Sequence, residues 1–136
     1  MKNAYITIKD RHMMDGETEE SCLTTVGKYE RLRDGFVLSY DEVGDFSGSI
    51  TEISYKGKQV LLNRQGRNVA KLIIEKDKRY NCLYRTEYAD LMLGVIGKSI
   101  NSEASGNEGK LTFSYLLDFN AGYSSSNELT VSYRLE

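Results

Sequence analysis

Tryptophan and proline are absent from this sequence of 136 residues, and histidine occurs once, at His12. The absence of proline suits a chain whose backbone N–H groups mostly join strand ladders, because proline removes a ladder donor. A nucleophilic triad needs a base, and the chain has only this one histidine, near its start, and no Gly-x-Ser-x-Gly motif. These absences favour a β-rich protein and weigh against an enzyme.

Cysteine is also scarce. Cys22 and Cys82 are sixty residues apart, so they form neither a Cys-x-x-Cys pair nor a metal-ligand spacing. Both lie in strand-like runs, where buried free thiols are common, and we expect structural roles for them. No stretch approaches the roughly 18 apolar residues of a membrane span, and no apolar segment follows the start of the chain. We therefore expect a cytoplasmic protein with no signal peptide and no membrane association.

Charge of one sign is not in excess. The chain has 18 basic and 20 acidic residues, a net charge of −2, and the signs are interspersed. A nucleic-acid-binding module usually concentrates basic residues on one face, so we expect no nucleic-acid partner.

Tyrosine, by contrast, is abundant, with ten residues in the chain. Tyrosine favours the pleated, half-buried surface of a β-sheet.

Alternation of apolar and polar residues with period two recurs along the chain and predicts β-strands. It begins at Ala4–Met14, where Ala4, Ile6 and Ile8 share one face. Tight turns separate the runs, because Asp-Gly and Lys-Gly pairs adopt the positive φ that short hairpins need. The turns are at Asp15-Gly16, Asp34-Gly35 and Lys56-Gly57, and a further turn is predicted at residues 64–67. Gly27 interrupts the second strand and indicates a bulge or sharp bend.

The second half of the chain centres on residues 79–98, which we interpret as two central strands joined at residues 85–88. Residues 101–109 are polar and are predicted to form a surface loop. Two more alternating strands follow, at 111–119 and 129–135. The sequence thus predicts an all-β fold, a single antiparallel up-and-down β-barrel of about eight to ten strands that spans residues 1–136 as one domain. Closure into a barrel removes exposed strand edges.

Several short motifs resemble those of a known family. They are Ser39-Tyr40-Asp41-Glu42, Gly48 with Thr51, the run Val60–Gly66 as Val-x-Leu-x-Arg-x-Gly, the run Tyr84–Tyr88 as Tyr-x-Thr-x-Tyr, and Gly109-x-Leu111 with Tyr115. On these motifs, which are densest over residues 38–98, the chain resembles the YwiB-like proteins, small bacterial proteins of unknown function. The resemblance implies a lipocalin-like (calycin) barrel. The glycine that the family places after the second tyrosine is Ala89 here, so that corner is expected to differ.

Five polar residues are the candidate ligand-binding site: Tyr40, Glu42, Arg64, Thr86 and Tyr88. Glu42 and Arg64 lie at predicted strand ends, where a barrel has its mouth. One hypothesis is that the arginine and the tyrosine hydroxyls orient the polar head of a small ligand, because polar groups converging on an apolar pocket are the usual small-molecule site. The other is that Glu42 and Arg64 form a rim ion pair that only fixes two turns.

The leading functional hypothesis is non-enzymatic binding of a small apolar or amphipathic molecule inside the barrel, by a monomer or homodimer without a cofactor. The alternative is a filled barrel that serves as a protein–protein interaction or self-association module. Lumen size separates the two, and a large interior set of Phe36, Leu38, Ile53, Leu62, Phe113 and Tyr115 would fill the barrel. Asp10, His12 and Asp15 are possible metal ligands, and Asp10 and His12 share a strand face; we expect no metal site, because Asp15 lies in the predicted turn.

Overall fold

The computed structural model describes residues 1–85, 88–119 and 124–136. Within these residues the chain forms ten strands and one short 3₁₀ turn. The strands are β1 (Lys2–Met14), β2 (Glu17–Leu32), β3 (Gly35–Asp41), β4 (Ser49–Lys56), β5 (Gln59–Gly66), β6 (Val69–Glu75), β7 (Arg79–Arg85), β8 (Asp90–Ser105), β9 (Glu108–Asp118) and β10 (Ser124–Leu135), and the 3₁₀ turn is η1 (Gly44–Phe46). No helix among the described residues is long and apolar enough to cross a membrane.

Each strand pairs antiparallel with its neighbours in sequence, and β1 also pairs with β10, so the sheet closes into a barrel. The closing ladder runs from Ala4 opposite Leu135 to Met13 opposite Ser126. A closed sheet leaves no row of unpaired backbone groups at an edge. The predicted all-β antiparallel barrel is confirmed, and it has ten strands over the described part of the chain.

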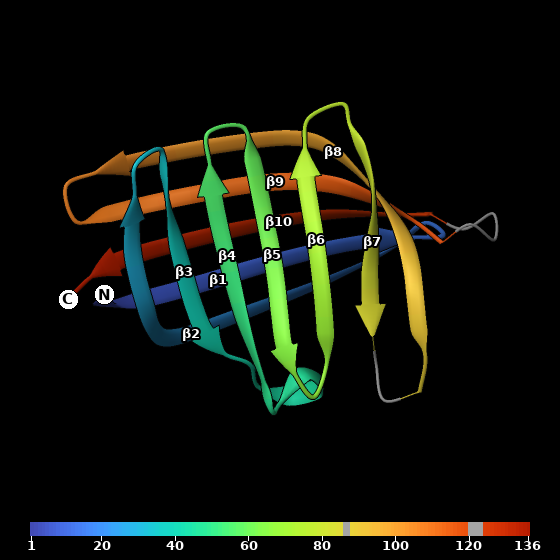
Figure 1. Ribbon diagram of the computed structural model, residues 1–136, viewed down its shortest axis with the longest axis horizontal. Helices are drawn as coiled ribbons and strands as arrows, with labels where there is room; N and C mark the ends of the chain where they lie inside the picture. The colour runs from blue at the N-terminus through green and yellow to red at the C-terminus, as the bar shows by residue number, and fades with distance from the viewer. Residues whose placement is uncertain (86–87, 120–123) are drawn as a thin grey trace.

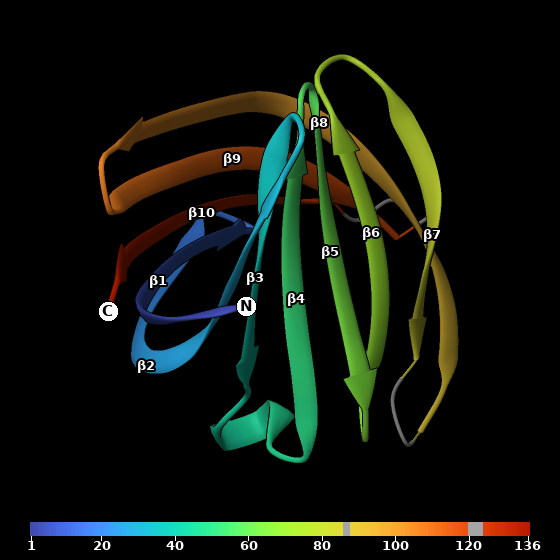
Figure 2. The same cartoon turned by 60° about the vertical axis from the view of Figure 1, so that its left-hand side comes forward.

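The barrel is flattened into two crossing layers, one of β3–β7 and one of β8–β10 with β1 (Figures 1 and 2). Strands β2 and β8, at 16 residues each, belong to both layers. β2 pairs first with β1 and then with β3, and it changes partner next to Gly27. A Cβ on Gly27 would lie 2.2 Å from the carbonyl oxygen of Ser39. The glycine therefore permits the close approach at this corner, as the sequence indicated.

A second corner lies where β8 passes from β7 to β9. The strand register shifts between Gly97 and Ser99, and a Cβ on Gly97 would lie 2.2 Å from the carbonyl oxygen of Glu75. The carboxylate of Glu75 binds Lys78 Nζ at 2.8 Å and accepts a hydrogen bond of 2.6 Å from Gln59 Nε2. These two contacts, Lys78 first, lower the pKa of Glu75 to about 2. The start of β5 and the end of β6 are therefore held together at this corner.

One end of the barrel is filled by side chains. Tyr29, Phe36 and Tyr133 pack together there: Tyr29 and Tyr133 stack with ring centroids 5.0 Å apart, and Phe36 is tilted against Tyr133 at 5.1 Å. The next layer inward contains fully buried aliphatic residues and Phe113. All six residues proposed as a filling set, Phe36, Leu38, Ile53, Leu62, Phe113 and Tyr115, are buried. Two of the six, Leu62 and Tyr115, line the cavity at the other end, so the predicted set fills only part of the barrel.

Three local predictions are wrong. Arg64 does not lie in a turn, because β5 continues to Gly66 and Arg64 pairs with Thr51 of β4. Residues 101–109 form the end of a long hairpin rather than a loop, since β8 runs to Ser105 and β9 begins at Glu108. Their polar composition reflects two exposed strands. Cys22 is exposed, whereas Cys82 is buried as expected.

Candidate functional site

The opposite end of the barrel contains a cavity of about 360 Å³. Its walls come from the inward faces of β1 and β5–β10, and Phe46 of η1 lies beside them. Larger hollows of about 660 and 440 Å³ lie on the outer surface, where most of the lining side chains are exposed. The lining of the inner cavity is mainly apolar: Phe46, Leu62, Ala70, Leu72, Leu91, Leu93, Leu117, Phe119 and Leu129. A small concave space with apolar walls and a few polar groups is the usual form of a ligand site.

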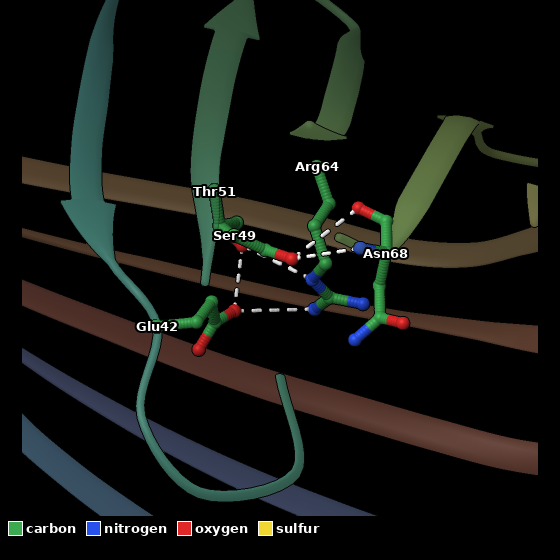
Figure 3. Close-up of polar contacts among 5 residues, drawn as sticks. All are labelled: Glu42, Ser49, Thr51, Arg64 and Asn68. Atoms are coloured by element: carbon green, nitrogen blue, oxygen red, sulfur yellow. Dashed lines mark hydrogen bonds and ion pairs between the residues drawn. The ribbon is translucent and has the colours of Figure 1, made fainter. Parts of the chain in front are cut away.

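Arg64, which lines the cavity, forms an ion pair with Glu42 (Figure 3). Arg64 Nη2 lies 3.2 Å from Glu42 Oε2, and Arg64 Nε donates a hydrogen bond of 3.2 Å to Thr51 Oγ1. The Thr51 hydroxyl in turn donates to Glu42 Oε2 at 2.6 Å. The guanidinium lies 4.0 Å from the ring centre of Phe46. Because only 12% and 9% of the Arg64 and Glu42 side chains are exposed, this triangle firmly ties the segment after β3 to β4 and β5.

The same end of β4 is joined to the turn between β5 and β6. The Asn68 backbone N–H donates to Ser49 Oγ at 2.9 Å (Figure 3). Ser49 is 2% exposed, and this contact gives its buried hydroxyl a hydrogen-bond partner. The mouth of the cavity is therefore built on strand ends held by side-chain contacts.

Asp10 and His12 bring polar atoms into the cavity from β1. They continue the inward face of Ile6 and Ile8, because alternate residues of a strand share a face. Asp10 Oδ1 is buried and has no hydrogen-bond partner among the described residues. Burial raises the pKa of Asp10, and the nearby His12 and Arg64 oppose that rise. A carboxyl group is thus present in the cavity without a matching donor.

His12 is held in place by β10. Its Nδ1 lies 2.8 Å from Asn127 Oδ1, and Asn127 Nδ2 donates to Ser125 Oγ at 3.1 Å. With the amide oriented in this way, Nδ1 of His12 carries the hydrogen and Nε2 is left for another partner. The chain of contacts fixes the ring of His12 at the cavity wall.

Two tyrosine hydroxyls complete the polar lining. Tyr84 and Tyr115 both line the cavity. Burial first, and then the Asp10 carboxyl, raises the pKa of Tyr115, which is 6% exposed. The pKa of Tyr40, also 6% exposed, is raised by burial and by Glu42. The hydroxyls of Tyr40 and Tyr115 therefore remain protonated and serve as hydrogen-bond donors or acceptors.

The structure brings together three of the five residues singled out from the sequence. Glu42 and Arg64 form the ion pair, and Tyr40 lies close enough to interact with both. Tyr88 does not join them, because its side chain is 89% exposed. Thr86 lies outside the described residues.

Sequence reasoning missed the polar groups inside the cavity. Asp10 and His12 do share a strand face, as expected, but they were weighed only as metal ligands. Asp15 lies in the turn after β1, and no group of three or more His, Cys, Asp or Glu side chains in the described ranges is placed to hold a metal ion. The usable signal was the unbroken parity from Ala4 to His12, which places both residues on the face of the buried core.

The fold and this cavity define a class of protein: a small closed β-barrel that is filled at one end and hollow at the other. A family model described as Domain of unknown function (DUF1934) matches residues 6–131, and the chain belongs to this family. The crystal structure of the ywiB protein from Bacillus subtilis is similar over 99% of this chain and 92% of that one, with a TM-score of 0.88 and 21% sequence identity. That likeness shows the shared fold. No match is found among curated proteins.

Proposed function

We propose that the protein is a non-enzymatic carrier or sensor that binds a small molecule with an apolar body in the hollow end of the barrel, in the manner of calycin-like barrels. The cavity of about 360 Å³ is the observation that carries this proposal. Its volume lies at the lower end of the range for ligand pockets, so the ligand is small. It corresponds to the volume of roughly a dozen water molecules in the liquid.

The arrangement of apolar side chains supports entry from the open end. Leu91 lines the cavity and is 43% exposed, and Met92 beside it is 56% exposed. An apolar ligand can contact this rim before it reaches the buried wall formed by Leu72 and Leu93. Burial of apolar surface along that path supplies the driving force for binding.

A variant that fills the cavity tests the proposal. Ala70 is 1% exposed and lines the cavity, so Ala70→Met places a flexible side chain in the space. Thr130→Met, on the outward face of β10, is the matched control. We expect saturation-transfer NMR to show octanol bound to the wild type and to the control, and weaker binding to Ala70→Met. Equal octanol signals from the wild type and Ala70→Met would place binding elsewhere and overturn the proposal.

Native mass spectrometry of gently purified protein, with a denatured control, addresses the natural ligand. An additional mass that is lost on denaturation supports the proposal and identifies the ligand by weight. The same spectrum tests the second candidate, a self-association module. The exposed apolar residues Tyr88, Leu91 and Met92 at the start of β8 favour that alternative. A dimer that dissociates in Met92→Lys and leaves the octanol site unchanged would support the second candidate.

A further inference from the structure

The inner end of the cavity has an unmatched acceptor. Along β1, His12 lies nearest the mouth, Asp10 is one inward position deeper, and Ile8 beyond it is 7% exposed and part of the core. Asp10 is therefore the deepest charged group in the hollow end. Its Oδ1 is buried with no donor among the described residues. Such an atom is costly in a folded protein unless something else supplies the hydrogen bond.

The other charges of the cavity are already matched. Glu42 is paired with Arg64 at 3.2 Å and also accepts from Thr51. Arg64 is therefore already engaged by Glu42, and the carboxyl of Asp10 is left as the acidic group of the lining with no ion pair among the described residues. A bound anion would meet this charge at short range, whereas a bound cation would neutralise it. The sign of the cavity thus favours a positively charged head group.

Aromatic rings surround the same region. Tyr84, Tyr115 and Phe119 line the cavity. Tyr115 is close enough to Asp10 for the carboxyl, after burial, to raise the pKa of the Tyr115 hydroxyl. The face of an aromatic ring attracts a cation within about 6 Å of its centre. A carboxylate beside tyrosine rings is therefore suited to an ammonium group, which also donates up to three hydrogen bonds.

We propose that the hollow end binds a small aliphatic or aromatic amine in its ammonium form, with the head on Asp10 and the hydroxyl of Tyr115 and the apolar body directed toward Leu91 and Phe46 at the mouth. This inference rests on the proposed function, because it names the chemistry of the ligand in the same cavity. It assigns to Asp10 a binding role that the rim residues Glu42 and Arg64 do not share.

Three ligands of one shape test the head group. Octylammonium, octanol and octanoate share an eight-carbon chain and differ in the charge of the head. We expect octylammonium to bind the wild type roughly tenfold more tightly than octanol, because a charge-assisted hydrogen bond is stronger than a neutral one. Octanoate should bind most weakly, since it meets the Asp10 charge. Dissociation constants from NMR titrations measure the order.

Asp10→Asn keeps the size of the side chain and removes its charge. We expect this variant to bind octylammonium roughly tenfold less tightly while its affinity for octanol stays within about twofold of the wild type. Asp41→Asn, at the exposed end of β3 near the mouth, is the matched control and should behave as the wild type. Retained octanol binding shows that both variants are folded with the cavity intact.

The outcomes separate the inference from the proposed function. If octanol binds but octylammonium has no advantage, or octanoate binds best, the ammonium inference is overturned and the ligand cavity stands. If the preference for octylammonium survives in Asp10→Asn, the role of Asp10 is overturned. If none of the three ligands binds the wild type in the cavity, the proposed function falls together with the inference.

Discussion

Asp10 shows how a single residue can be kept at some cost to stability. Its carboxyl is partly buried, one oxygen lacks a donor among the described residues, and burial raises its pKa. A carboxyl group whose pKa is raised on folding binds its proton more tightly in the folded state. Its ionisation therefore destabilises the protein as pH rises from the ordinary pKa of 3.8 through the folded value. A binding role offers a reason for such a residue.

Replacement of this charge should therefore stabilise the protein. We expect Asp10→Asn to increase the free energy of unfolding at neutral pH by about 1 kcal/mol, which corresponds to a melting temperature roughly 3 °C higher. Below pH 3.8 the wild-type carboxyl is protonated in both states, so the difference should disappear. Thermal unfolding of both proteins across this pH range measures the effect. A variant less stable than the wild type at neutral pH would contradict the argument.

Removal of one charge from the Glu42–Arg64 ion pair should, by contrast, destabilise the protein. Arg64→Met leaves Glu42 as a largely buried, unpaired carboxylate, because only 9% of that side chain is exposed. We expect a loss of about 3 kcal/mol in the free energy of unfolding, measured by urea titration. The double variant Arg64→Met with Glu42→Leu removes both charges and should recover much of the loss. If the double variant is less stable than Arg64→Met alone, the loss does not come from an unpaired buried Glu42 carboxylate, and this explanation is wrong.

The sequence predicted one part of this site and missed another for a physical reason. Glu42 and Arg64 were predicted to lie at strand ends and they do form an ion pair, although Arg64 lies within β5. The parity of β1 places Asp10 and His12 on the buried face, but parity alone does not distinguish a packed interior from a cavity at that end of the strand. Closure of β1 against β10 decides which face is interior, and that contact joins opposite ends of the chain.

At the scale of elements, the corners of the long strands are the most constrained points. Gly97 lies in β8 at the corner, with no space for a Cβ because the Glu75 carbonyl oxygen would be 2.2 Å away. We expect Gly97→Ala to destabilise the protein by about 3 kcal/mol, since backbone must move to admit the methyl group. Gly106→Ala is the control: its φ is +61°, but nothing lies within 4 Å of its Cβ. Its cost should be about 1 kcal/mol, from conformation alone. Equal losses in chemical denaturation would refute the steric account.

Elements with local signals were predicted well. Hairpins are found at all three predicted places, because turn chemistry acts within a few residues, but only Asp15-Gly16 is itself the predicted two-residue turn. The other two turns are Arg33-Asp34 and Gly57-Lys58, each one residue away from the predicted pair. The hairpin of β8 and β9 was misjudged at residues 101–109, where the strands are polar and exposed. Polar residues on both faces of a hairpin that extends beyond the core resemble a loop in composition. Only the long-range pairing distinguishes them.

At the scale of the whole molecule, the packed core and the proposed binding cavity occupy different ends of one barrel. Leu111 lies in the filled part and is fully buried, whereas Leu72 lines the cavity and is 6% exposed. We expect Leu111→Ala to cost about 4 kcal/mol, because it creates a new void in tight packing. Leu72→Ala enlarges a space that already exists and should cost about 2 kcal/mol. Urea unfolding compares the two directly, and a larger loss for Leu72→Ala would show that the hollow end carries the greater share of stability.

Because the two ends of the chain are in contact, the same barrel could be formed by a chain with its strands in a different sequence order. The Glu136 N–H donates to the Asn3 carbonyl oxygen at 3.1 Å, so the ladder of β1 and β10 continues to the chain ends, which lie side by side in Figure 1. Because the ring of strands is closed, the chain could begin at another strand without losing a strand pair. A short linker from residue 136 to residue 1, with a new opening at Gly106, would give a circular permutant that keeps every strand pair and the cavity. In such a gene β9 would come first and β8 last, and the polar wall from β1 and β10 would be translated as one continuous segment.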